Sequence, residues 1–123
     1  MSTGVSAPQV LVVDDEPLIR WCIAETLGAA GYAITEAQDA ASALRALAAM
    51  PEPAVILLDL RLPDSNDLGL LRQIRNVAPT AAVIMMTAFG TPDVTAGALE
   101  LGARGVLTKP FDMHDLEHVV SSL

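Results

Sequence analysis

The chain has 123 residues, 52% of them apolar, and a formal net charge of −8 from 15 acidic and 7 basic residues. This length suits one domain with a single core, and every apolar run is much shorter than the roughly 18 residues that a membrane-spanning helix needs. The negative charge repels phosphate backbones, which argues against direct contact with nucleic acid.

The first residues and the cysteine content favour a cytoplasmic protein. Residues 1–8 lack the basic start and the apolar stretch of a secretory signal, so we expect a flexible leader followed by one domain at residues 9–123. Cys22 is a single cysteine and cannot form an internal disulfide. The sequence has no GxxxxGK phosphate loop, which argues against ATP as a direct ligand.

Short apolar runs alternate along the chain with segments of helical pattern. The runs QVLVV, AVILLDL and AAVIMMT are nearly continuous, which is typical of strands covered on both faces, while YAITEA and GVLT are weaker strand candidates. Proline in a first turn, Asp before an Ala/Leu stripe, and Gly or Pro after a last turn mark the helix ends. In chain order the predicted elements are a strand at 9–13, a helix at 17–30, a strand at 32–37, a helix at 39–50, a strand at 54–60, a helix at 67–77, a strand at 81–87, a helix at 92–101, a strand at 105–108 and a helix at 112–123.

This strict alternation predicts an α/β fold. Short connections between successive strands and helices require parallel strands with right-handed crossovers. We therefore expect a five-stranded parallel sheet with five alternating helices on both faces, a doubly wound, flavodoxin-like arrangement. Such sheets bind ligands at the carboxyl ends of their strands.

Three acidic residues are predicted to meet at that edge. Asp14 and Asp15 follow the first strand directly, and Asp59 lies at the end of the third. Gathered carboxylates raise one another's pKa unless a cation lies among them, and oxygen ligands suit Mg²⁺ or Mn²⁺. In the alternative interpretation Asp14, Asp15 and Glu16 cap the first helix, and Asp59 is a residue of the turn that ends its strand.

A hydroxyl and an ammonium group are predicted at the same edge. Thr87 ends the fourth strand and Lys109 follows the fifth. Taken singly, they are an ordinary β-former and a surface Lys before a turn Pro. Taken with the carboxylates, they indicate a phosphoryl site with a metal, a nucleophile and two stabilisers of charge.

Four segments of the chain, VLVVDDEP, LLDLRLPD, VIMMTAFG and LTKPF, resemble in order and spacing the signature segments of response-regulator receiver domains. Those of nitrogen-regulation-type transcription activators are the most similar. The resemblance implies that Asp59 is the phosphoacceptor and that Thr87 and Lys109 bind the phosphoryl oxygens. It also implies a cis peptide bond between Lys109 and Pro110.

The same resemblance implies a magnesium site. Asp15, Asp59 and the main-chain carbonyl of Arg61 would hold Mg²⁺ directly, and Asp14 would hold it through water.

The function implied is a phosphoacceptor switch of a two-component system. It would take its phosphoryl group from a sensor histidine kinase or a phosphotransfer domain, and it would catalyse its own phosphorylation and slow hydrolysis without being a turnover enzyme. An effector region after the last helix is expected, as is a homodimer through the fourth helix, fifth strand and fifth helix. The alternatives are a degenerate receiver that only binds proteins and a small-molecule phosphatase, although the latter would need an acid where Arg61 stands.

Three departures from the family pattern carry their own predictions. Val106 stands where the family usually has Tyr or Phe, which argues against an aromatic rotamer switch. Asp67 stands where the family usually has Gly. An Asp tolerates a left-handed backbone at some cost, so the loop is expected to be stiffer or differently turned. Gly97 lies inside the fourth helix at a cost of about 1 kcal/mol relative to Ala, and Gly90 precedes the predicted cap Thr91, so that helix is expected to be mobile.

Two other features remain open. Trp21, on the first helix, either packs in the core or belongs to a docking surface for the kinase or phosphotransfer domain. His114 and His118 have the i, i+4 spacing of zinc ligands, but no third ligand is evident, and two solvated histidines are the favoured interpretation.

Overall fold

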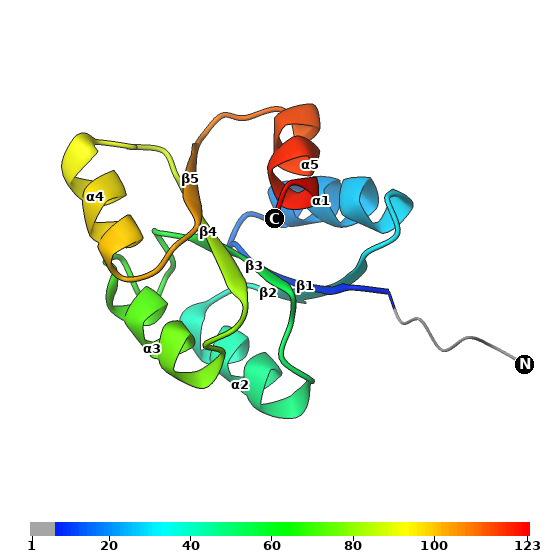
Figure 1. Cartoon of the computed structure of the whole chain (residues 1–123), viewed down its shortest axis with the longest axis horizontal. Coiled ribbons are helices and arrows are strands. Elements are labelled where there is room, and N and C mark those ends of the chain that lie inside the picture. The colour runs from blue at the N-terminus through cyan, green and yellow to red at the C-terminus, as the bar shows by residue number, and fades with distance from the viewer. Residues whose placement is uncertain (1–6) are drawn as a thin grey trace, which may run out of the picture.

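The computed structural model describes residues 7–123 and shows five strands and five helices in strict alternation (Figure 1). Every predicted element is present, with ends at most two residues from their predicted positions. Residues 1–6 of the predicted leader lie outside the described residues. The elements are β1 Gln9–Val13, α1 Pro17–Ala29, β2 Ala33–Ala37, α2 Ala40–Ala49, β3 Val55–Asp59, α3 Gly69–Val77, β4 Ala82–Thr87, α4 Pro92–Glu100, β5 Gly105–Thr108 and α5 Met113–Ser121.

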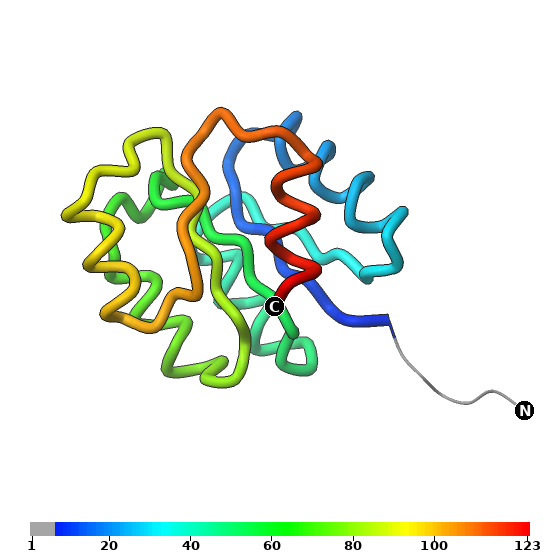
Figure 2. Tube along the Cα trace, turned by 45° about the horizontal axis from the view of Figure 1, so that its top comes forward, coloured from blue at the N-terminus to red at the C-terminus, as the bar shows by residue number. Residues whose placement is uncertain are grey.

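The strands form one parallel sheet in the order β2-β1-β3-β4-β5. Helices α1 and α5 cover one face of the sheet, and α2, α3 and α4 cover the other (Figure 1). Helix α4 lies beside the edge strand β5, as the tube in Figure 2 also shows. The predicted parallel, doubly covered sheet is therefore confirmed.

The central strands β1, β3 and β4 send alternate side chains into two separate cores, which explains why their sequences are nearly continuous apolar runs. In β1, Leu11 and Val13 pack under α2, α3 and α4, while Val10 and Val12 pack under α1 and α5. The central strands β3 and β4 are buried at every position. Within residues 7–123, no helix has the length and apolar character needed to cross a bilayer.

Side chains cap three of the helices and fix where they start. Asp39 and Ser42 form a reciprocal capping box at α2, Thr91 caps α4, and Asp112 caps α5. Helix α3 starts differently, because Asp67 accepts a hydrogen bond from the Gly69 N–H at 2.8 Å in the loop before it. Asp67 has a negative φ, so it does not adopt the left-handed conformation.

Candidate functional site

The carboxyl ends of four strands bring the predicted site residues together. Asp14 follows β1, Asp59 and Thr87 end β3 and β4, and Lys109 follows β5. Asp59 pairs in register with Met86, the residue before Thr87, so these strand tips are level with each other. The peptide between Lys109 and Pro110 is cis, as predicted.

Four carboxylates form a cluster at this edge. Asp14, Asp15, Glu16 and Asp59 each place one oxygen within 4.8 Å of the others. Asp14 is fully buried and Asp59 is 6% exposed, whereas Asp15 and Glu16 face solvent. A purely oxygen donor set that is half buried and half open to water fits Mg²⁺, which keeps several of its own waters when it binds.

The Lys109 ammonium group lies among these carboxylates. Its Nζ donates hydrogen bonds to Asp14 Oδ2 at 2.8 Å, to Asp59 Oδ2 at 3.1 Å and to Glu16 Oε1 at 3.1 Å. Burial alone would lower the pKa of Lys109, but the bonds to Asp14 and Glu16 and the charges of Asp14 and Asp59 outweigh burial and raise that pKa. Lys109 is therefore a fixed positive charge at the site.

Burial also shifts the pKa of Asp59, which is raised above its ordinary value. Removal from water raises the pKa of Asp59, and the nearby charge of Asp14 raises it further. The Arg61 N–H, which donates to Asp59 Oδ1 at 3.1 Å, and the charge and hydrogen bond of Lys109 act in the opposite direction. A carboxylate held at this cost in a sheet edge is typical of a reactive group rather than of a turn residue.

Thr87 is buried, and its hydroxyl oxygen accepts a hydrogen bond from the Phe89 N–H at 3.1 Å. The hydroxyl therefore holds the start of the loop between β4 and α4. Phe89 itself is 61% exposed, and the Arg61 guanidinium lies 5.2 Å from the centre of its ring, within the range of a cation–π contact. Arg61 follows β3 and Phe89 follows β4, so the two side chains meet beside the strand ends that carry Asp59 and Thr87.

Three contacts at the site were not predicted. Glu16 was considered only as a helix cap, but its side chain makes no capping bond and pairs with Lys109. Asp64 accepts hydrogen bonds from the Ala40 and Ala41 N–H groups at 2.8 and 3.1 Å. Arg20 donates to the main-chain carbonyl of Asp14 at 2.6 Å. The only sequence signal for any of them was that Glu16 adjoins the Asp pair.

The other candidate residues lie outside the cluster. Trp21 is 59% exposed beside the exposed Leu18, so the core-packing interpretation of Trp21 is wrong. Val106 is partly buried against the core under α2, α3 and α4. His114 and His118 lie on the exposed surface of α5, and within residues 7–123 no third metal-binding group joins them.

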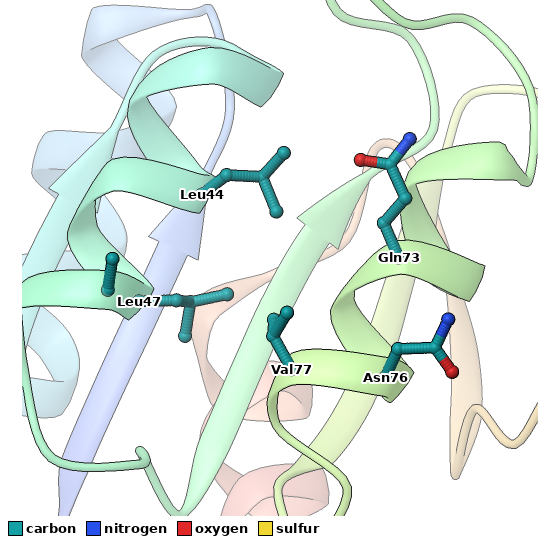
Figure 3. Close-up of a pocket in the computed structure, with 6 residues that line it drawn as sticks. Leu44, Leu47, Gln73, Asn76 and Val77 are labelled. Carbon is teal, nitrogen blue, oxygen red and sulfur yellow. The ribbon is translucent and has the colours of Figure 1, made fainter.

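Of two hollows with different linings, the one over the cluster has the charged groups that group transfer needs. One of about 290 Å³ opens over the cluster and is lined by Asp15, Asp59, Arg61 and Lys109 among others. A larger one, of about 560 Å³, lies between α2 and α3 (Figure 3). Its walls are leucine, alanine and valine side chains with two amides, and it contains no ionisable group that could take part in group transfer.

Comparison with known proteins identifies related chains. The sequence model of the response regulator receiver domain matches residues 10–121. The DNA-binding transcriptional regulator NtrC of Escherichia coli strain K12 is 41% identical over 106 residues, which cover 86% of this chain and 22% of NtrC. This chain therefore spans about a fifth of the length of that relative.

Two solved structures have the same fold. The receiver domain of NtrX from Brucella abortus is 34% identical, with a TM-score of 0.83, over 92% of this chain and 95% of that one. A CheX–CheY–BeF3–Mg complex from Borrelia burgdorferi contains a chain that is 25% identical, with a TM-score of 0.88, over 95% of this chain and 89% of that one.

Proposed function

This chain belongs to the response regulator receiver domains of two-component signalling, and from that premise we propose that its switch is the magnesium-dependent phosphorylation of Asp59. The observation that carries the proposal is the triple contact of Lys109 Nζ with Asp14, Asp59 and Glu16. It joins a buried carboxylate with a raised pKa to a fixed cation at the carboxyl edge of a parallel sheet. This is the edge at which such folds bind ligands.

The carboxylate cluster would hold the metal. Asp15, Asp59 and the carbonyl of Arg61 would bind Mg²⁺ directly, and Asp14 would bind it through water. When bound, the ion stabilises negative charge on the phosphoryl oxygens. The complex of a related protein with BeF3 and Mg supports this assignment.

Asp59, Lys109 and Thr87 each have a separate role in the transfer of the phosphoryl group. A carboxylate oxygen of Asp59 attacks the phosphorus of a phosphohistidine, an O–P bond forms, the P–N bond breaks, and the imidazole leaves. Lys109 moves its hydrogen bonds from the carboxylates to a phosphoryl oxygen. Thr87 releases the Phe89 N–H and donates its hydroxyl to another phosphoryl oxygen, which pulls on the loop leading into α4.

Slow hydrolysis of the aspartyl phosphate follows from the same residues. Arg61, two positions after Asp59, cannot accept a proton from an attacking water. The domain is therefore a switch rather than a turnover enzyme, and a small-molecule phosphatase is the less favoured alternative.

The partners follow from the exposed surfaces and from the relatives. Leu18 and Trp21 form an exposed apolar patch on α1, which would dock a sensor histidine kinase or phosphotransfer domain in the cytoplasm. The net charge of −8 on this domain repels DNA, so an effector region beyond α5 would make any contact with DNA. No membrane contact is proposed. Leu99 on α4 is exposed and supports a homodimer through α4, β5 and α5.

Calorimetry tests the metal site. Mg²⁺ should bind with a Kd on the order of millimolar, because the protein supplies few ligands and the ion keeps several waters. Beryllofluoride should then bind at one equivalent, and only with the metal. Asp15→Asn should weaken Mg²⁺ binding, while Asp67→Asn, which removes the same charge outside the cluster, should not. Equal affinity for Mg²⁺ in wild type and Asp15→Asn would contradict the assignment of Asp15 as a ligand.

A further inference from the structure

Arg20 joins the loop after β1 to the neighbouring strand. The residue lies in α1, and its side chain is only 15% exposed. Its Nη1 donates to the carbonyl oxygen of Asp14 at 2.6 Å, and its Nε donates to Glu36 Oε1, on β2, at 3.2 Å. One planar guanidinium therefore makes two bonds in different directions, which a single ammonium group cannot reproduce.

The carbonyl that Arg20 holds belongs to the peptide that joins Asp14 to Asp15. The other polar atoms of Asp14 are also held: its N–H donates to the Ala37 carbonyl at 3.1 Å, and its carboxylate accepts from the Glu16 N–H at 2.9 Å and from Lys109. Asp15 is exposed, and its side chain has no hydrogen bond among the described residues. Among these contacts, the position from which the Asp15 side chain starts is fixed by the peptide that precedes it.

We propose that Arg20 is a positioning residue of the metal site, which fixes the Asp14–Asp15 peptide so that the Asp15 carboxylate is ready to bind Mg²⁺. The proposal rests on the proposed function, in which Asp15 is a magnesium ligand. Arg20 does not touch the metal in this account. It restricts the main chain from which the Asp15 side chain starts.

The charge of Arg20 has the opposite effect to its hydrogen bond, and this makes the proposal testable. A cation near the cluster repels Mg²⁺, so loss of the charge alone would tighten metal binding. Loss of the hydrogen bond frees the peptide and would weaken binding, as loss of an outer partner of a metal ligand does in other sites, by tenfold or more. The sign of the change in affinity therefore separates the two roles.

The experiment is calorimetric titration of Mg²⁺ into wild type, Arg20→Met, Arg20→Lys and Arg72→Met. Arg72 is exposed on α3, so its loss lowers the net charge equally and controls for the general field. We expect Arg20→Met to raise the Kd about tenfold, Arg20→Lys to remain weaker than wild type, and Arg72→Met to bind as wild type does. An unchanged or lower Kd in Arg20→Met, or full affinity in Arg20→Lys, would overturn the proposal.

A double-mutant cycle with Asp15→Asn separates this proposal from the function on which it rests. If Arg20 acts through Asp15, the two substitutions together should weaken Mg²⁺ binding little more than Asp15→Asn alone. Fully additive losses would overturn the positioning role. If Asp15→Asn weakens binding and Arg20→Met does not, only the positioning role fails. If Asp15→Asn leaves the affinity for Mg²⁺ unchanged, the assignment of Asp15 as a ligand is wrong, and the proposed role of Arg20 is wrong as well.

Discussion

The burial of Asp59 costs the fold stability, because its carboxylate is nearly inaccessible to water and lies near a second buried carboxylate, Asp14. Lys109 offsets part of that cost through its hydrogen bonds to both residues. The balance favours a protonated Asp59 more than in an unfolded chain, since the pKa of Asp59 is raised. Stability without metal should therefore depend on pH through this residue.

We expect Asp59→Asn to raise the free energy of unfolding at neutral pH in the absence of metal. A raised folded-state pKa means that the folded protein binds the proton more tightly, so the cost is present above that pKa and disappears as the pH falls through it towards 3.8. Urea unfolding of both proteins between neutral pH and pH 4 measures this. The difference should shrink on acidification, and a difference that grows would contradict the assignment.

Asp64 gives a second prediction at this scale. Both of its carboxylate oxygens accept N–H groups in the first turn of α2, from Ala40 and Ala41, so it ties the loop after Asp59 to that helix. Asp64→Ala should cost about 1–2 kcal/mol, as loss of a helix cap does. Asp67→Ala removes an exposed carboxylate with one local bond and should cost less in the same thermal unfolding experiment. Equal losses of stability in the two variants would show that Asp64 does not hold the loop against α2.

Sequence patterns locate some of these residues and miss others for a physical reason. Asp14, Asp59 and Lys109 follow directly from strand ends, since parallel strands deliver those positions to one edge. Arg20 and Asp64 bind main-chain groups, and Asp64 reaches a helix more than twenty residues away. Unlike a helix cap, such contacts follow no local sequence pattern, so neither role was visible before the fold was known.

At the scale of elements, the loop and helix after β4 are fitted closely to their neighbours. The sequence predicts mobility for α4 from Gly90 and Gly97. The structure adds a second role for both glycines, because a Cβ at Gly90 would collide with the Thr108 hydroxyl, and one at Gly97 would lie 2.9 Å from a methyl group of Leu68. The glycines therefore allow close approach, and the mobility of α4 stays a prediction.

Gly90→Ala should therefore destabilise the protein by about 1–3 kcal/mol, the usual cost of an overpacked site. Gly28→Ala is the matched control, because nothing lies within 4 Å of its added methyl group in α1 and the helix gains up to about 1 kcal/mol. Denaturant unfolding of both variants gives the two free energies. The close packing of the β4–α4 loop would be disproved by a Gly90→Ala variant as stable as Gly28→Ala.

We expect the lifetime of the phosphorylated state to depend on the contact between two loops. Phe89 and Arg61 lie in contact beside the cluster, one on the loop after β4 and one on the loop after β3. The ring is bulky and apolar, so it should obstruct an attacking water, and neither residue supplies a base. We expect Phe89→Ala to speed phosphate loss several-fold, whereas Leu99→Ala, on the exposed surface of α4, should leave the rate unchanged. Phosphate release after removal of the donor measures both, and equal rates for Phe89→Ala and wild type would exclude the shielding role.

At the scale of the whole molecule, the alternation of elements predicts the parallel sheet and its two helical layers, and the structure confirms both. The strand order β2-β1-β3-β4-β5 does not follow from alternation, because a strand can join either side of a growing sheet. This order places β1 beside β3 and so brings Asp14 against Asp59. The candidate site is thus a product of topology, to which four of the five strands contribute residues at their carboxyl ends.

Mass measurement of the intact protein after incubation with acetyl phosphate tests the central claim, that Asp59 is phosphorylated with the help of magnesium. Wild type should gain one phosphoryl group per chain with Mg²⁺ and none when the metal is chelated. Asp59→Asn, with its fold verified by circular dichroism, should gain none under either condition. Equal incorporation by Asp59→Asn, or incorporation by wild type that chelation leaves unchanged, would contradict the account.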